Sequence, residues 1–209
     1  MSSIPLERAI SKLGIASRAQ ARAWIMAGDV AVDGRVCTDP LLPVDPSTVR
    51  LTHRGGALKP AVRRILMLHK PRGVVCTRSD EKGKKTIFDL YPEEFAGLHS
   101  AGRLDMATSG LLLLTNDTRL SSFLTDPANG IPRVYVVTVR GRVDEACVER
   151  MLGGVEDRGE DLRAGSVTIR KASNHESHIV MTLTEGKNRE IRRLCAAVGH
   201  EVTRLKRVA

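Results

Sequence analysis

Aromatic side chains make up only 3% of this 209-residue sequence, and long apolar runs are missing from it. The scarcity of aromatics argues against a module that binds single-stranded nucleic acid mainly by base stacking. No apolar run approaches the roughly 18 residues that a membrane-spanning helix needs, and Met1–Pro5 lacks the apolar segment of a signal peptide. We therefore expect a soluble, cytoplasmic protein without a membrane partner.

Cysteines and the commonest ligand-binding motifs are also few. The four cysteines are widely spaced and form no C-x-x-C, so we expect reduced, mostly buried thiols rather than disulfides or a zinc site. The sequence contains neither G-x-x-x-x-G-K-[ST] nor G-x-G-x-x-G, so no nucleotide-hydrolysing, dinucleotide or methyl-donor site is indicated. His175 and His178 lie three residues apart with no third ligand nearby, which favours a strand-edge pair over a metal site. We expect no metal and no cofactor.

Positive charge is what the sequence does have. Lysine and arginine number 33 against 24 acidic residues, which gives a net charge of +9. Such an excess points to a polyanionic partner, most often nucleic acid. A basic protein that is simply soluble is the alternative at this point.

The segment Leu6–Val36 predicts two short helices followed by a β-hairpin. Apolar residues recur at helical spacing before Gly14, which ends the first helix. Ser17 is the predicted N-cap of the second helix, which Gly28 ends. Val30–Val32 then leads into an Asp-Gly hairpin turn.

Basic residues four positions apart lie on one face of each expected helix, Arg8 with Lys12 and Arg18 with Arg22. Taken alone, these faces could bind RNA or only be solvated. The order of elements and the rhythm S-R-x-x-A-x-x-x-I-x-x-G-x-V resemble the S4 RNA-binding domain. We predict an S4 domain over residues 5–52, a linker over residues 53–62 and a second domain over residues 63–209.

The second domain shows apolar stretches typical of strands, in no regular alternation with helices. One is ILMLHKP, which GVVCT is expected to resume after the proline; Leu111–Leu114 predicts a buried strand or the buried edge of a helix. The others are Val134–Val139, Ser166–Ile169 and His178–Leu183. Arg189–Val198 predicts a helix with Gly199 as its C-cap.

Asp105 is the acidic residue of greatest interest, because it lies between an arginine two residues earlier and four consecutive leucines. It could mark a simple turn into a core strand, or be an acid whose surroundings tune it for chemistry. From Gly186 to Ala209 there are seven lysines and arginines against two acidic residues. A basic residue beside the apolar face of that helix can reach inward to pair with a partly buried carboxylate, can contact phosphate, or can be solvated.

Four stretches together resemble the RsuA-like family of ribosomal RNA pseudouridine synthases: GRLDMATSGLLLLTND, HKPRGVVCT, VYVVTV and LTEGKNREIRRLCAAVGHEVTRLKR. The resemblance spans nearly the whole chain, and an S4 domain is the usual companion in that family. It implies an α+β protein in which the S4 domain precedes a mixed, largely antiparallel β-sheet with flanking helices. It also implies a cofactor-free isomerase that detaches the uracil of an RNA uridine, rotates it and rejoins it through C5.

The resemblance assigns roles to individual residues. Asp105 would be the catalytic aspartate, acting at the sugar as nucleophile or charge partner, and Arg192 would pair with its carboxylate and keep it ionised at the edge of a dry pocket. Tyr135 would pack on the uracil and is a candidate for handling a proton. Arg103 would hold RNA with the base flipped out, and Leu205 would line the other side of the pocket. Further RNA contacts are expected from basic residues: Lys187, Arg189, Arg8, Lys12, Arg18 and Arg22.

The sequence departs from the family pattern in three places. Arg133 stands where a lysine usually precedes the tyrosine, and Asp117-Thr118 replaces the usual Asp-Gly turn. Family members normally continue for a few tens of residues past R-L-x-R, a stretch that usually completes the edge of the catalytic sheet, whereas this sequence ends at Ala209. We expect a monomeric enzyme acting on ribosomal RNA, closer to the large-subunit branch; the alternative is a non-catalytic RNA-binding or ribosome-assembly factor.

Overall fold

The computed structural model describes residues 3–209, and the chain divides into two compact units. The first contains the chain up to Leu66 with Phe95–His99 and Leu114–Ser122; the second contains Met67–Glu94, Ser100–Leu113 and Phe123–Ala209. No helix within residues 3–209 is long and apolar enough to cross a membrane.

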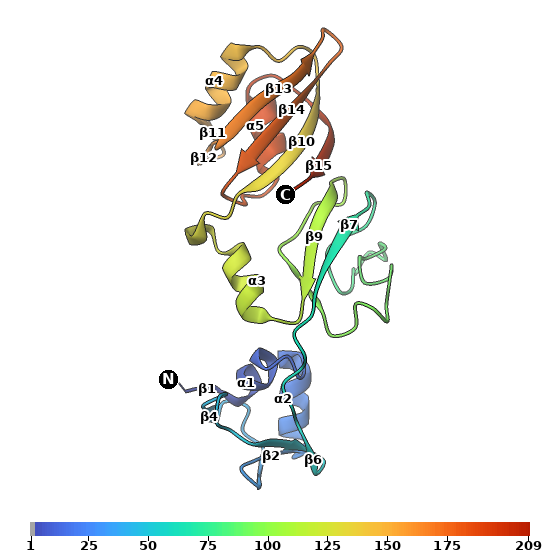
Figure 1. The fold of residues 1–209 in the computed structure, drawn as a ribbon, viewed down its shortest axis with the longest axis vertical. Helices are drawn as coiled ribbons and strands as arrows, with labels where there is room; N and C mark the ends of the chain where they lie inside the picture. The colour runs from blue at the N-terminus through green and yellow to red at the C-terminus, as the bar shows by residue number, and fades with distance from the viewer. Residues whose placement is uncertain (1–2) are drawn as a thin grey trace. The chain divides into compact units, whose positions relative to one another are not determined.

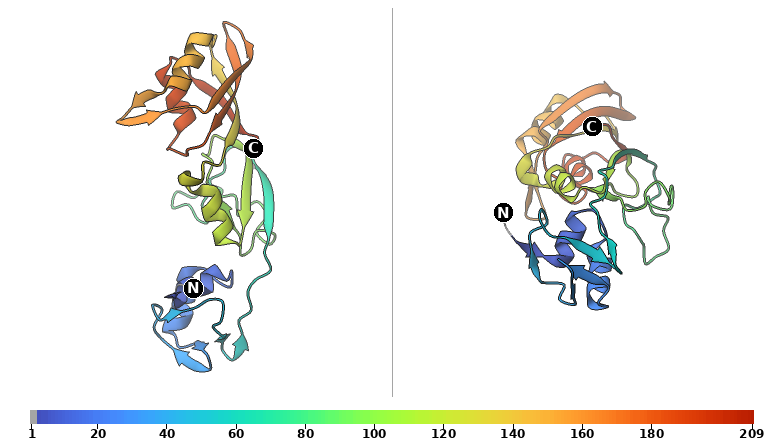
Figure 2. Two further views of the ribbon diagram at one scale, coloured as in Figure 1. Left: turned by 60° about the vertical axis from the view of Figure 1, so that its left-hand side comes forward. Right: turned by 60° about the horizontal axis from the view of Figure 1, so that its bottom comes forward.

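The first unit contains the two predicted helices, α1 (Leu6–Lys12) and α2 (Arg18–Met26). Ser17 is the N-cap of α2, and its side chain accepts a hydrogen bond from the Gln20 amide at 3.2 Å. The two helices bury a shared apolar cluster that includes Leu6, Ile10 and Ile25. Figure 2 shows them beside the small strands of the same unit. Both helix predictions are confirmed.

The strands of the first unit form two small sheets. The larger has the order β3-β2-β5-β6, and the smaller pairs β1 with β4. Their bounds are β1 Ile4–Pro5, β2 Val30–Val32, β3 Arg35–Cys37, β4 Pro43–Val44, β5 Leu51–His53 and β6 Gly56–Ala57. The segment expected as a linker begins within a hairpin formed by β5 and β6. Arg54 and Gly55 form its turn, and both adopt positive φ (51° and 81°).

A mixed sheet with the strand order β13-β14-β10-β15-β9-β7 carries most of the second unit, and β8 pairs with β9 beside it (Figure 1). The pairs β13–β14, β14–β10 and β10–β15 are antiparallel, whereas β15 and β9 run parallel. The strands are β7 Ile65–Lys70, β8 His99–Ala101, β9 Ser109–Thr115, β10 Arg133–Arg140, β13 Ser166–Ala172, β14 Glu176–Leu183 and β15 Val202–Arg207. The predicted α+β class is confirmed.

Helices α4 and α5 pack against this sheet. The helical segments are α3 (Thr118–Thr125), the 3₁₀ turn η1 (Pro127–Asn129), α4 (Glu145–Gly153) and α5 (Glu190–Ala197), and a hairpin joins β11 (Val155–Asp157) to β12 (Glu160–Leu162). Side chains of α4 and α5, such as Met151 and Leu194, are fully buried against Val137 and Ile179 of the sheet. Helix α5 matches the prediction; α3 and α4 were not predicted.

One expectation about strands is wrong, and one strand was not predicted. The stretch GVVCT does not resume a strand, since its only ladder contact is an isolated bridge between Val75 and Thr86. Strand β15 was not predicted, although it lies in the middle of the sheet between β10 and β9. Its basic residues alternate with apolar ones, a pattern typical of an exposed strand. It is a central strand because β10 pairs with one of its edges and β9 with the other.

Gly110 sets the close approach of β9 to β15. The register pairs Gly110 with Arg207, and a Cβ atom built on Gly110 would lie 2.0 Å from the Arg207 carbonyl oxygen. Gly110 also has a φ of +109°, which other residues rarely adopt. A glycine is therefore required where the strand that follows Asp105 meets the strand that carries Leu205.

Candidate active site

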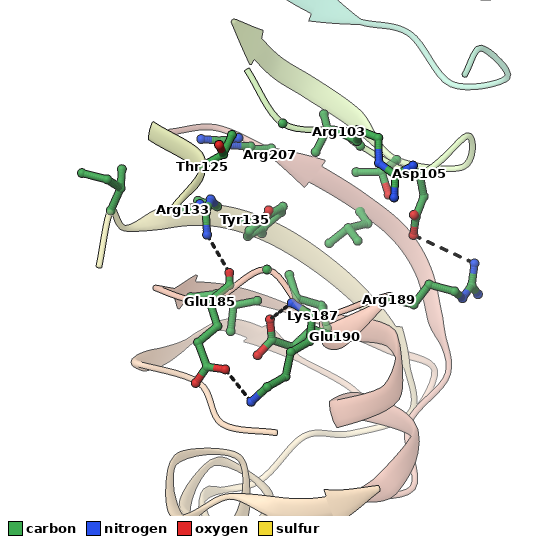
Figure 3. Close-up of a pocket in the computed structure, with 18 of the residues that line it drawn as sticks. Arg103, Asp105, Thr125, Arg133, Tyr135, Glu185, Lys187, Arg189, Glu190 and Arg207 are labelled. Carbon is green, nitrogen blue, oxygen red and sulfur yellow. Dashed lines mark hydrogen bonds and ion pairs between the residues drawn. The ribbon is translucent and has the colours of Figure 1, made fainter. Parts of the chain in front are cut away.

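A cavity of about 320 Å³ opens in the second unit (Figure 3). Its walls come from the segment before β9, from β10 and β15, and from the start of α5. It brings together every site residue predicted for residues 63–209: Arg103, Asp105, Tyr135, Lys187, Arg189, Arg192 and Leu205. The basic residues predicted near the N-terminus belong to the first unit.

The backbone that carries Asp105 is fixed by a buried lysine. Lys70 is fully buried at the end of β7, and its ammonium group donates to three carbonyl oxygens, those of Pro71 (3.1 Å), Asp105 (3.1 Å) and Thr108 (2.9 Å). Burial lowers the pKa of Lys70. Sequence reasoning missed this residue; the available signal was a lysine that ends an apolar strand directly before a proline.

The Asp105 side chain is 38% exposed at the cavity edge, so it is more accessible to solvent than the expected dry pocket would allow. Its ion-pair partner in the structure is Arg189, with Nη1 4.0 Å from Oδ2 (Figure 3). Arg189 adopts the left-handed conformation, with φ 50° and ψ 31°, immediately before α5 begins. This backbone geometry directs a long side chain back over the aspartate.

Arg192, the expected partner of Asp105, makes a different contact. Its Nη1 donates to the Val202 carbonyl oxygen of β15 at 3.0 Å, and its buried Nε has no partner. The expected direct pair with Asp105 is therefore absent, because Arg192 lies on the flank of α5 that faces β15. Burial lowers the pKa of Arg192, and the nearby negative charge of Asp105 opposes that shift.

Tyr135 and Leu205 share one face of the sheet. The β10–β15 register sets Tyr135 opposite Arg207 and Val137 opposite Leu205. Burial raises the pKa of Tyr135, and the neighbouring Arg207 counteracts part of that rise. Burial also lowers the pKa of Arg207, whose Nε donates to the Ala209 carbonyl oxygen at 2.9 Å. The cavity thus has an aromatic ring and an aliphatic side chain in its walls.

Arg133 and Glu190 complete the wall beneath Tyr135. Arg133 donates to the carbonyl oxygens of Glu185 (2.8 Å) and Leu124 (3.1 Å), which joins the turn after β14 to the end of α3. Glu190 is buried, and its Oε2 accepts a hydrogen bond from the Lys187 amide at 3.2 Å. Its Oε1 is buried without a partner, and burial raises its pKa. Nothing in the residue pattern distinguished Glu190 from an ordinary helix-start carboxylate.

Two of the predicted RNA-binding arginines have structural partners in the first unit. Arg22 donates to the buried Glu7 carboxylate at 2.7 Å, and Arg18 lies 3.5 Å from it. Both arginines also keep about half or more of their side chains exposed. Arg8 is exposed and Lys12 is half-buried. Across residues 3–209 there is no group of three or more His, Cys, Asp or Glu side chains that could hold a metal ion.

Comparison with known proteins gives two family matches. The model described as RNA pseudouridylate synthase matches residues 64–197, and the S4 domain model matches residues 4–49. A solved structure described as a pseudouridylate synthase is 28% identical, covers 98% of this chain and 87% of its own, and superposes with a TM-score of 0.66.

Curated relatives carry the name ribosomal large subunit pseudouridine synthase B. The relative from Pseudomonas aeruginosa is 40% identical over 97% of this chain, and the one from Bacillus subtilis is 33% identical over the same share. The chain spans 54% of the length of the Pseudomonas relative and 83% of that of the Bacillus relative.

Proposed function

Since this chain belongs to the RNA pseudouridylate synthase family, we propose that it isomerises a uridine in ribosomal RNA to pseudouridine, with Asp105 as the catalytic aspartate. The observation that carries the proposal is the placement of Asp105 at the edge of a cavity walled by Tyr135 and Leu205. At about 320 Å³, the cavity falls within the range of roughly 300–1,000 Å³ typical of small-ligand sites.

The reaction exchanges one bond for another within a single nucleotide. The N1–C1′ bond breaks, the uracil turns, a C5–C1′ bond forms, C5 loses a proton and N1 gains one. The atoms therefore balance without a co-reactant. The base must first leave its stack, at a cost of a few kcal/mol, and Arg103 at the cavity mouth is placed to occupy the gap that it leaves.

Each cavity residue has a task that its position supports. The exposed edge of the Asp105 carboxylate is available to the ribose, either as nucleophile or as a charge next to the sugar. Tyr135 and Leu205 enclose the uracil ring, and burial raises the pKa of the Tyr135 hydroxyl further above its ordinary value of 10.0, so it is a proton donor rather than a base at neutral pH. Arg192 lies close enough for its positive charge to interact with Asp105 without a direct ion pair.

We also propose that the substrate is large-subunit ribosomal RNA. The support is the name shared by the relatives from Pseudomonas aeruginosa and Bacillus subtilis. The S4 domain match over residues 4–49 and the net charge of +9 are consistent with an RNA partner. The RNA-binding residues proposed for that domain are Arg8, Lys12, Arg18 and Arg22.

The test is pseudouridine mapping, by carbodiimide-dependent stops of reverse transcription, on unmodified small- and large-subunit ribosomal RNA. We expect one new stop in the large-subunit RNA with the unaltered chain and none with Asp105→Asn. The matched control is Asp161→Asn, which removes an exposed carboxylate outside the cavity and should keep the stop. An unchanged stop with Asp105→Asn would refute the site assignment.

Binding without any stop would favour the alternative, a non-catalytic RNA-binding or assembly factor. A stop confined to small-subunit RNA would retain the enzyme and correct its substrate.

A further inference from the structure

A second hollow adjoins the cavity in which we propose that the uracil binds, and Asp105 lines both. Its volume is about 380 Å³, and it shares Arg103, Asp105 and Arg189 with the first cavity. Its remaining walls include Asn188 and the segment around Thr77. A ribose positioned at Asp105 would therefore have its base in one hollow and its continuing backbone at the mouth of the other.

The unpaired charge in the walls of the second hollow is positive. Arg103 is exposed and forms no ion pair within the part of the chain that the structure describes. Other ionic groups of the walls already have partners within the protein. Lys187 forms an ion pair with Glu185 and donates to the Asp161 carbonyl oxygen at 2.6 Å. Asp80 accepts backbone hydrogen bonds of 3.0 Å from two lysines of its own turn, those of residues 82 and 84.

Arg189 is the cation best placed to change partners. Its side chain is 54% exposed, and its contact with Asp105 is 4.0 Å long, at the outer limit of an ion pair. Exposed pairs of this kind contribute little free energy, whereas an arginine can bind a phosphate through two parallel hydrogen bonds. Its left-handed backbone is a conformation that a non-glycine residue holds at a cost, and such strain clusters at functional sites.

We propose that the second hollow is a subsite for the nucleotide next to the reacting uridine, and that Arg189 exchanges its contact with Asp105 for the phosphate that links the two. Arg103 and Asn188 border the same phosphate position. The exchange also frees the carboxylate as RNA arrives. The inference rests on the proposed function in one respect, that the ligand is RNA.

The chain offers a matched control for Arg189. Arg158 is also an arginine with positive φ (57°), its side chain is 81% exposed, and it lines neither hollow. Arg189→Gly and Arg158→Gly each remove one positive charge and relieve the same kind of backbone strain. Both are compared in the Asp105→Asn background, so that bound RNA is not converted during the measurement.

The first measurement is the salt dependence of binding to short hairpins transcribed from ribosomal RNA, which needs no knowledge of the target uridine. Arg189→Gly should weaken binding roughly tenfold and reduce the slope of log affinity against log salt by about one, whereas Arg158→Gly should change neither. Equal effects of the two substitutions would overturn the inference. This measurement does not depend on catalysis. Absence of pseudouridine formation would therefore refute the proposed function, whereas the binding comparison would still test the subsite.

The second measurement locates the contact. In the hairpin that contains the mapped uridine, each flanking phosphate in turn is replaced by an uncharged methylphosphonate. One replacement should weaken binding in the Asp105→Asn and Arg158→Gly proteins but have no further effect in Arg189→Gly. Additive losses at both phosphates would show that Arg189 binds elsewhere on the RNA, and would refute the subsite.

Discussion

The ammonium group of Lys70 and the backbone carbonyl oxygen of Asp105 lie 3.1 Å apart, although the two residues are 35 positions apart in the chain. The same group binds the Thr108 carbonyl oxygen, so the lysine holds the turn at both ends. Lys70 thus fixes the backbone beneath Asp105 without binding its carboxylate, whose ion-pair partner is Arg189. Preorganisation of this kind matters because a misplacement of about 1 Å can cost roughly 100-fold in rate.

Lys70→Met should therefore reduce both stability and turnover. The substitution keeps the aliphatic bulk and removes the ammonium donor from three carbonyl oxygens, of which that of Thr108 lies in a fully buried hydrogen bond. The free energy of unfolding should fall by about 3 kcal/mol. Urea unfolding measures the first effect, and pseudouridine formation at saturating RNA measures the second. Lys84→Met, at an exposed lysine of the same unit, is the control. Wild-type turnover in a destabilised Lys70→Met protein would show that the lysine supports folding alone.

Gly110→Ala tests the junction between β9 and β15. The added methyl group would overlap the Arg207 carbonyl oxygen, so the strands must separate, at an expected cost of about 3 kcal/mol or more. Gly159→Ala is the matched control, since Gly159 has a φ of +75° with nothing within 4 Å of the added atom. Thermal unfolding of the two variants separates the clash from the backbone strain. Similar midpoints would mean that the close approach costs nothing.

Glu190→Gln should stabilise the protein at neutral pH. Burial raises the pKa of Glu190 above its ordinary value of 4.5, and the surrounding charges are Glu185, Lys187, Arg133 and Tyr135 when ionised. The protonated carboxyl is the form that the folded state favours. Its contribution is complete below the unfolded pKa and is lost as pH rises through the folded pKa.

Glutamine carries no charge at any pH, so its advantage in thermal midpoint should grow as the pH rises from the ordinary glutamate pKa of 4.5 toward neutrality. Glu149→Gln, on the exposed face of α4, should show no comparable pH dependence. A constant difference between Glu190→Gln and wild type across this range would indicate that glutamine stabilises by packing and that the charge of Glu190 is not destabilising.

Local patterns were enough to predict much of the molecule. Helices α1, α2 and α5 follow from apolar spacing and from end signals such as the Ser17 N-cap, because these signals act within a few residues of the chain. The C-cap of α5 is Val198 rather than the predicted Gly199, which follows it with a φ of +93°. Short apolar stretches likewise located β7, β9, β10 and β14. The family resemblance of the stretches around Asp105 and Tyr135 predicted that both residues share one site, and both line the cavity.

Only the tertiary structure decided which groups meet at that site. Asp105 pairs with Arg189 rather than Arg192, because a left-handed residue before α5 turns one arginine toward the carboxylate while the other donates to β15. The buried lysine beneath Asp105 and the glycine contact with Arg207 both join segments that are distant along the chain. The sequence by itself determined the local elements and indicated the residues that we propose carry the chemistry, whereas long-range packing determined their partners, because a pattern of neighbours along the chain contains no distances across it.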